Sequence, residues 1–160
     1  MSYDIDLKDP VTKEVIQLPV KHLMTGGTFE ADYDEKTGRF APKPIREAHH
    51  NITYNYSSYY YDAAEGDDRF FGQLPDDYKS EVPRNLGIRG IYGKTGAESI
   101  PMLEDLIQRI ESKYKKNGEW KASESPNEDY WKDTAGNAIR PLYQLIAMAE
   151  LRPDGVWDGD

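Results

Sequence analysis

The stretch TGAESIPMLEDLIQRIESKYKK, residues 95–116, decides much of the fold. Apolar side chains recur in it at helical spacing, namely at Leu103, Leu106, Ile107, Ile110 and Tyr114. Because residues three and four apart share one side of a helix, the pattern predicts an amphipathic helix over about residues 98–116 with one face in a core. The lysines near its end and Asn117-Gly118 after it favour termination there.

Two arrangements could begin this helix. Thr95 and Glu98 have the spacing of a capping box, in which each side chain accepts a hydrogen bond from the backbone of the other residue. Alternatively, Ser99 could cap the helix with Pro101 in its first turn. The sequence leaves both arrangements open.

A second apolar stripe predicts another helix that runs to Leu151 and ends before Pro153. The stripe consists of Leu142, Leu145, Ile146 and Ala149. The start of this helix is open, because Pro141 cannot donate a backbone hydrogen bond and would kink an established helix. The connector before it, residues 119–133, is polar.

The N-terminal part of the chain has the period of strands. Apolar residues alternate with aspartates over residues 3–7, and a proline turn follows, which predicts a hairpin over residues 3–18. Residues 28–40 predict a second hairpin, with its turn at residues 34–38.

The segment after the hairpins fits two patterns. Ile52, Tyr54 and Tyr56 alternate with polar residues, which suits a strand followed by a short helix. Alternatively, Pro44 could occupy the first turn of one helix over residues 44–64. Local propensity does not separate the two patterns.

At 160 residues and 18.3 kDa, the chain is long enough to bury the core of one domain. We therefore expect a single compact domain over residues 1–160. Its class should be α+β, with N-terminal β-hairpins packed against two or three helices. Residues 65–86 are rich in Asp, Gly, Pro and Arg, and we expect them to form an exposed loop.

The chain is acidic, with 29 Asp and Glu residues against 20 Lys and Arg residues and a net charge of −9. Because phosphate contacts need a positive surface, this charge disfavours nucleic-acid binding and favours a basic partner. The absence of cysteine excludes disulfides and thiolate chemistry. No apolar run has the length of a membrane span and no leader pattern stands at the N-terminus, so we expect a cytoplasmic protein without membrane contact.

Two glycine-rich blocks could approach a ligand closely. Gly26-Gly27-Thr28 could cradle an anion, or form a plain turn, and Gly93-Lys94-Thr95-Gly96 could do the same or form a capped helix entrance. The candidate contacts of a small ligand are Gly26, Gly27, Thr28, Asn51, Asn55, Arg89, Lys94 and Thr95. The three histidines lack zinc-binding spacing, so we expect neither a metal nor another cofactor.

The sequence contains no catalytic signature. A serine-hydrolase elbow is absent, and paired carboxylates carry little information in so acidic a chain. We therefore expect a binding protein rather than an enzyme. The candidate partner contacts combine tyrosines, which are enriched at interfaces but also fill cores, with paired aspartates: Tyr59, Tyr60, Tyr61, Asp67, Asp68, Asp76 and Asp77.

Four blocks of the chain resemble an uncharacterised family of small accessory proteins from phages, prophages and mobile elements. The blocks are GGTF at 26–29, NITYNY at 51–56, GIRGIYGKTGAESIP at 87–101 and PDGVWDGD at 153–160. The resemblance covers nearly the whole chain and implies a setting, a bacterial host cell, rather than any catalytic residue. We expect the blocks, distant in sequence, to meet in space.

In that setting we expect an inhibitor of a host defence system that engages a basic protein. The expectation is an analogy with anti-CRISPR and antirestriction proteins, which are often small, acidic and free of catalytic motifs. An acidic face can occupy the DNA-binding channel of a basic nuclease. Two alternatives stay open: a small-molecule or nucleotide-binding protein that uses the glycine-rich blocks, and an unrecognised enzyme.

Overall fold

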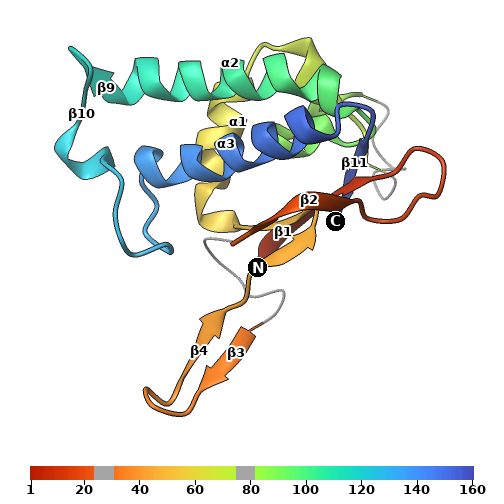
Figure 1. Ribbon diagram of the computed structural model, residues 1–160. Coiled ribbons are helices and arrows are strands. Elements are labelled where there is room, and N and C mark those ends of the chain that lie inside the picture. The colour runs from red at the N-terminus through yellow and green to blue at the C-terminus, as the bar shows by residue number, and fades with distance from the viewer. Residues whose placement is uncertain (24–30, 75–81) are drawn as a thin grey trace.

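The computed structural model describes residues 1–23, 31–74 and 82–160. Helices lie together on one side of the molecule and strands on the other, as Figure 1 shows. A hairpin of β3 (Ala31–Asp34) and β4 (Arg39–Pro42) projects away from both layers. The chain is a compact α+β domain, as its sequence predicts.

A three-stranded antiparallel sheet has the order β11-β1-β6. Its strands are β1 (Ser2–Lys8), β6 (His49–Thr53) and β11 (Val156–Gly159). Successive side chains of a strand point to opposite faces. Tyr3, Ile5 and Leu7 are therefore buried in the core, while the aspartates between them face away from it. The central strand β1 pairs with β11, whose residues lie about 150 positions later in the sequence.

The predicted hairpin over residues 3–18 forms only in part. The chain turns back after β1, and the Ile16 N–H donates to the Leu7 carbonyl (3.0 Å). β2 (Gln17–His22) then leaves β1 and pairs with β5 (Ile45–Glu47), because β6 and β11 occupy both edges of β1. The second hairpin forms as β3 and β4, with Gly38 at φ 66° in its turn. Its predicted residues 28–30 lie outside the described residues.

α2 (Gly96–Tyr114) confirms the helix predicted from the apolar period. A capping box closes its first turn: Thr95 Oγ1 accepts from the Glu98 N–H (3.1 Å), and Glu98 Oε2 accepts from the Thr95 N–H (2.8 Å). Ser99, the alternative cap, lies inside the helix and donates to the Gly96 carbonyl. Backbone donors at this helix end are thus satisfied within the chain.

α3 (Ala135–Leu151) confirms the second predicted helix and shows where it starts. The Thr134 hydroxyl caps it by accepting from the Asn137 N–H (3.1 Å). Pro141 lies inside the helix, where it removes one backbone hydrogen bond. The Asn137 side chain anchors the first turn by donating to the carbonyls of Asp129 and Lys132.

The segment after β5 is the strand β6 followed by a helix, so the alternative of one helix over residues 44–64 is wrong. The strand ends at Thr53, and Tyr54 and Tyr56 of the predicted strand lie after it. After β6 come η1 (Tyr54–Tyr56) and α1 (Ser57–Ala64). Of the predicted loop 65–86, residues 75–81 lie outside the described residues, and the rest is only partly an exposed loop, because it includes short elements and Phe70 is fully buried. The elements here are η2 (Asp68–Phe70), β7 (Phe71–Gly72) and β8 (Arg84–Asn85).

Short elements complete the domain. η3 (Gly87–Ile91) leads into α2, and β9 (Lys115–Lys116), β10 (Glu119–Trp120) and η4 (Ala122–Glu124) follow it. In the three described ranges, no helix combines the length and the apolar character that crossing a membrane requires.

Candidate binding surface

Two of the glycine-containing blocks meet along β11. The Gly93 N–H donates to the Trp157 carbonyl (2.9 Å), and the Trp157 N–H donates to the Lys94 carbonyl (3.0 Å). The Gly96 N–H donates to the Gly155 carbonyl (2.8 Å). The turn before α2 therefore covers the outer edge of β11, and its backbone groups serve the fold.

Trp157 anchors this junction. Its side chain is 1% exposed, and its indole N–H donates to Ser99 Oγ (2.7 Å). The two glycines beside it are required by space: a Cβ at Gly155 would lie 2.6 Å from the Leu7 side chain, and one at Gly159 would lie 2.5 Å from the Asp4 carbonyl. The C-terminal block is thus a docked strand of the core.

Arg89 links a third block, NITYNY at 51–56, to this junction at β11. Its Nη2 donates to the Tyr54 hydroxyl (2.7 Å), and its Nε donates to the backbone oxygen of Asp160 (2.7 Å). Its guanidinium also lies over the Tyr3 ring, 4.7 Å from the centroid. Three of the four blocks therefore meet, as predicted, whereas GGTF lies outside the described residues. Arg89 is engaged by the protein itself rather than free for a ligand.

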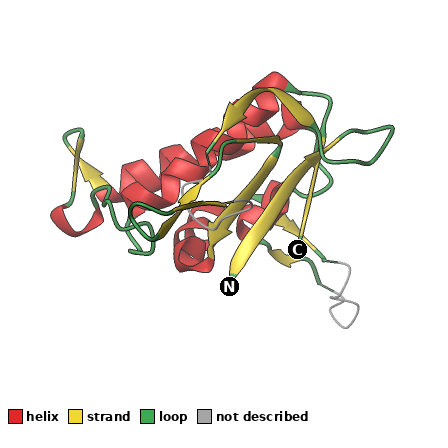
Figure 2. Cartoon of the chain, turned by 60° about the horizontal axis from the view of Figure 1, so that its bottom comes forward, coloured by secondary structure: helices red, strands yellow, loops and turns green. Residues whose placement is uncertain are grey.

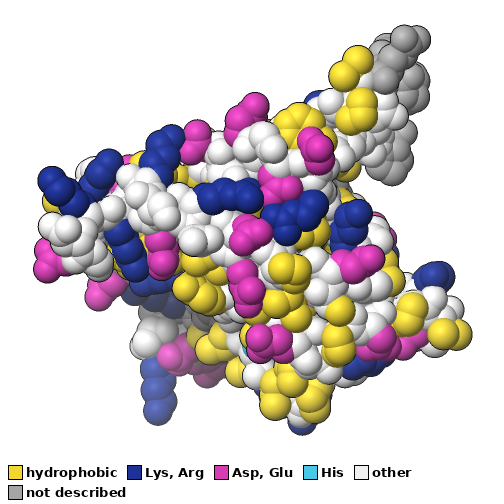
Figure 3. Space-filling view, turned by 90° about the horizontal axis from the view of Figure 1, so that it is seen from above, with side chains coloured by type: hydrophobic (Ala, Val, Ile, Leu, Met, Phe, Trp, Pro, Cys, Tyr) yellow, Lys and Arg dark blue, Asp and Glu magenta, His cyan; other side chains and the backbone are white. Residues whose placement is uncertain are grey.

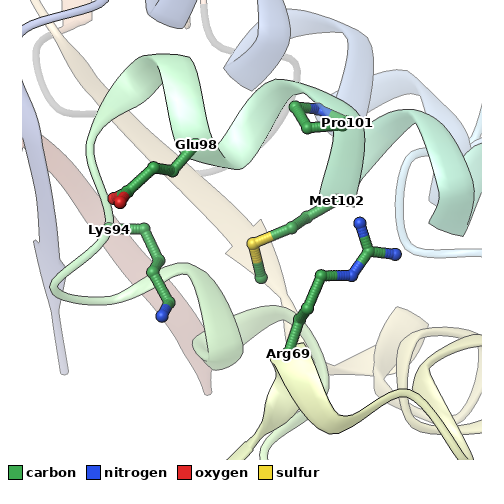
Figure 4. A pocket seen from close by; sticks show the side chains of 5 residues that line it. All are labelled: Arg69, Lys94, Glu98, Pro101 and Met102. Carbon is green, nitrogen blue, oxygen red and sulfur yellow. The ribbon is translucent and has the colours of Figure 1, made fainter.

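The candidate phosphate block is a capped helix entrance. Thr95 is used by the capping box, and Lys94 lies at an open pocket of about 250 Å³ beside it (Figure 4). Arg69 reaches the same pocket from η2, but its guanidinium is held by Asp67 and Asp105, each at 2.6 Å. This pocket therefore presents Lys94 beside the apolar Met102 and Pro101 rather than a row of backbone donors.

The other candidate ligand contacts are also engaged within the chain. Asn51 Nδ2 donates to Ser2 Oγ (2.7 Å) and to Asp4 Oδ1 (2.6 Å) across the sheet. Asn55 Nδ2 donates to the Trp131 carbonyl (2.7 Å). Gly26, Gly27 and Thr28 lie outside the described residues. The predicted ligand residues that the structure describes do not converge on one cavity.

The predicted tyrosine surface is largely interior. Tyr59 and Tyr60 are buried in the core, where their hydroxyls donate to Glu124 Oε2 and to the Ala138 carbonyl (both 2.7 Å). Burial raises the pKa of both side chains. Only Tyr61 of the three keeps a partly exposed side chain. The helical repeat of α1 turns Tyr59 and Tyr60 inward, so the run does not form one contact face.

The predicted Asp67–Asp68 pair does not form an open acidic surface either. Asp67 pairs with Arg69 (2.6 Å) and Arg109 (2.9 Å), and hydrogen bonding from Arg69 holds the pKa of its carboxyl well below the usual range. Asp68 is exposed. Asp76 and Asp77 lie outside the described residues.

A different set of carboxylates gathers on the sheet face that points away from the core. Strand register places Asp4, Asp6 and Asp158 there, and Asp160, which follows β11, accepts from the Asp4 N–H through its Oδ1 (3.1 Å). Asp4 and Asp158 have side chains 51% and 54% exposed. Figure 2 shows these strands in front of the helices when the lower side of the molecule is brought forward. We call these four residues the acidic sheet face.

Two basic side chains lie within the acidic sheet face. Lys8 Nζ is 2.5 Å from Asp158 Oδ2, and this contact lowers the pKa of the Asp158 carboxyl. His49 Nδ1 is 2.6 Å from Asp6 Oδ1 and its Nε2 is 3.6 Å from Asp4 Oδ1. Four carboxylates outnumber the three basic side chains beside them, Lys8, His49 and Arg89, the last of which donates to the Asp160 backbone oxygen, so the acidic sheet face carries a net negative charge.

Sequence reasoning missed this face for a specific reason. The alternation of aspartates in β1 indicated a half-buried strand, and Asp158 and Asp160 show the same spacing. Nothing local in the sequence shows that β11 pairs with β1.

Comparison of the chain with protein-family models, with curated proteins and with solved structures gives no match.

A cavity lies next to the acidic sheet face. It has a volume of about 410 Å³ and is lined by Gln73, Leu74, Leu86, Tyr92, Gly93 and residues 158–160. The Tyr92 hydroxyl is buried and has no hydrogen-bond partner among the described residues. Burial raises the pKa of Tyr92, so this hydroxyl stays neutral and can both donate and accept a hydrogen bond.

Proposed function

We propose that this protein acts by binding a basic surface of another protein through the acidic sheet face. The observation that supports the proposal is the contrast between the two sides of the molecule. On the helical side, acidic and basic side chains are interleaved, as Figure 3 shows from above. On the sheet side, four carboxylates outnumber the basic side chains beside them, which are Lys8, His49 and Arg89.

The helical side pairs its charges locally. Asp62 lies 2.7 Å from Lys113, Asp105 lies 2.6 Å from Arg69, and Glu111 lies 3.0 Å from Lys115. The fields of the two opposite charges in such a pair cancel beyond the Debye length, which is about 8 Å in physiological salt. The unbalanced acidic sheet face therefore supplies the field that a distant basic partner meets first.

The backbone makes this face rigid. Asp4, Asp6 and Asp158 extend from strands that are hydrogen-bonded on both sides or docked by Trp157. Side chains fixed on strands lose little conformational entropy on binding, which favours recognition of a basic surface. The resemblance to phage and mobile-element accessory proteins supports the further step that the partner belongs to a host defence system, such as a nuclease.

Capture from a lysate of a host bacterium tests the proposal. We compare the wild type with Asp4→Lys/Asp158→Lys, and with the control Glu104→Lys/Glu119→Lys, which changes the net charge equally on exposed positions elsewhere. We expect a basic protein that the wild type and control retain and the sheet variant loses. Equal capture by all three proteins, or no capture by the wild type, would contradict it.

A second candidate function is binding of a small polar ligand in the cavity beside β11. Tyr92 lines this cavity, and its buried hydroxyl, which has no hydrogen-bond partner among the described residues, favours this function. A buried polar group without a partner costs about 1–3 kcal/mol, which a ligand hydrogen bond could recover. A thermal-shift screen of nucleotides and polar metabolites tests it, with Tyr92→Phe as the control that should lose any stabilisation seen.

A further inference from the structure

The outward side of α3 is apolar along much of its length. Tyr143 and Leu151 are 52% and 43% exposed, and Ala147 lies exposed between them. A groove of about 110 Å³ runs between α3 and β2, with Leu18 and Val20 in its opposite wall. Figure 3 shows hydrophobic side chains gathered on one flank of the molecule, beyond the charged row. Exposed apolar surface of this kind marks an interaction site.

Opposite charges stand at the two ends of this apolar strip. Arg140 and Glu150 are both exposed, and neither forms an ion pair within residues 1–23, 31–74 and 82–160. Arg140 donates only to the Asn127 carbonyl (3.2 Å). Ten residues of helix separate them, which corresponds to about 15 Å. At 100° per residue, all these side chains lie on about one third of the helix circumference.

This pattern is complementary to itself. If two copies of α3 lie antiparallel about a two-fold axis that crosses the exposed side of the helix at the level of Leu145, Arg140 of one copy is level with Glu150 of the other. The same symmetry places Tyr143 of each copy level with Ala147 of the other, so that a large side chain faces a small one. A two-fold interface requires such self-complementarity, because one patch must match its own inverted image.

We propose that the protein forms a two-fold symmetric dimer through the outward side of α3 and the adjoining β2 groove. A standard interface buries about 800 Å² per partner, which is less than a tenth of the 9249 Å² of accessible surface of this chain. The acidic sheet face lies on other strands and is not part of this interface. The proposal is therefore independent of the proposed function.

Charge reversal and mixing test the dimer. We measure sedimentation equilibrium of the full chain as wild type, Arg140→Glu and Glu150→Arg. We expect the wild type to show a concentration-dependent mass approaching twice 18.3 kDa. Each single variant should weaken the dimer at least about tenfold, because like charges then meet at both symmetric contacts.

The two single variants supply the sharpest comparison when they are mixed. Arg140→Glu carries two negative side chains on α3 and Glu150→Arg carries two positive ones, so the mixture should form a heterodimer as tight as the wild type. Circular dichroism melts confirm that each variant is folded. A monomeric wild type, or single variants that dimerise as well as the wild type, would overturn the proposal. So would a mixture that stays monomeric.

Discussion

The two faces of the β11-β1-β6 sheet are built from the same strands and differ in every property that matters for function. The inner face includes Tyr3, Ile5, Leu7, Ile52 and Trp157, all buried. The outer face carries the acidic sheet face with Lys8 and His49. One register fixes both sets of side chains, because strand residues alternate between faces.

Within one strand, the inner side chains contribute to stability and the outer side chains are available for recognition. Removal of an inner side chain leaves a cavity in a close-packed core and costs stability. Substitution of an outer carboxylate removes an exposed charge, which typically changes stability little. The same strand can therefore keep its fold while its outer residues determine the partner.

The largest expected effect is that of Trp157→Ala. The truncation removes a fully buried aromatic side chain and leaves Ser99 Oγ without the indole donor. We expect about 3–5 kcal/mol of destabilisation, measured by urea unfolding. Trp157→Phe retains most of the apolar volume and should cost less. An unchanged urea midpoint for Trp157→Ala would show that β11 does not contribute to the core.

A pH-dependent loss of stability should follow from His50, which lies on the inner face opposite Ile5. Burial lowers the pKa of His50 from 6.5 to about 3. In the unfolded chain this residue takes up a proton first, so its contribution is fully present above pH 6.5 and is lost as pH falls toward 3. The slope is about 1.4 kcal/mol per pH unit.

Urea melts between pH 7 and 4 measure this effect, with His50→Leu as the comparison. The variant should show a flatter dependence of stability on pH, since it has no imidazole to protonate on unfolding. Carboxylates contribute equally to both proteins. Parallel curves for the wild type and the variant would contradict the account of His50.

A smaller effect is expected at Arg89, which holds the sheet to η3 at the edge of the inner face. Arg89→Met removes the bonds to the Tyr54 hydroxyl and the Asp160 backbone. We expect about 1–2 kcal/mol of destabilisation, because the group is charged but only partly buried. A double-mutant cycle with Tyr54→Phe should give a coupling energy of about 0.5–1 kcal/mol. Additive effects would contradict a direct contact.

The smallest change in stability should come from the outer face. Asp4→Lys/Asp158→Lys should unfold within about 1 kcal/mol of the wild type, because the Lys8–Asp158 pair that it breaks is exposed and Asn51 Nδ2, which loses Asp4, keeps Ser2 Oγ as an acceptor. Thermal melts check this outcome. A loss as large as that of Trp157→Ala would show that the outer residues also determine the fold.

The helices and the strand alternation could be predicted from the sequence because they depend on local period and capping. The apolar repeat of α2 and the Thr95–Glu98 capping box are examples. The pairing of β1 with β11 could not, because no local pattern specifies which distant strand occupies an edge. The start of α3 was hidden for another reason: Pro141 suggests an interruption, whereas the helix is capped by Thr134 and continues through the proline.

The candidate binding residues show the same difference between local patterns, which the sequence contains, and long-range contacts, which it does not. The tyrosine run at residues 59–61 indicated an interface, but the turn of α1 buries two of its members. The Asp67–Asp68 pair indicated an acidic patch, but Arg69 and Arg109 neutralise Asp67 from other elements. Composition correctly indicated an excess of acid. Only the assembled sheet shows where that excess is exposed.

The most direct test is the salt dependence of affinity for the captured basic partner. Kd is measured across a range of ionic strength for the wild type, Asp4→Lys/Asp158→Lys and the control Glu104→Lys/Glu119→Lys. We predict that the sheet variant loses at least about tenfold in affinity at low salt and shows a shallower salt dependence, while the control keeps the wild-type slope. Equal affinities and equal slopes for the sheet variant and the control would contradict recognition through the acidic sheet face.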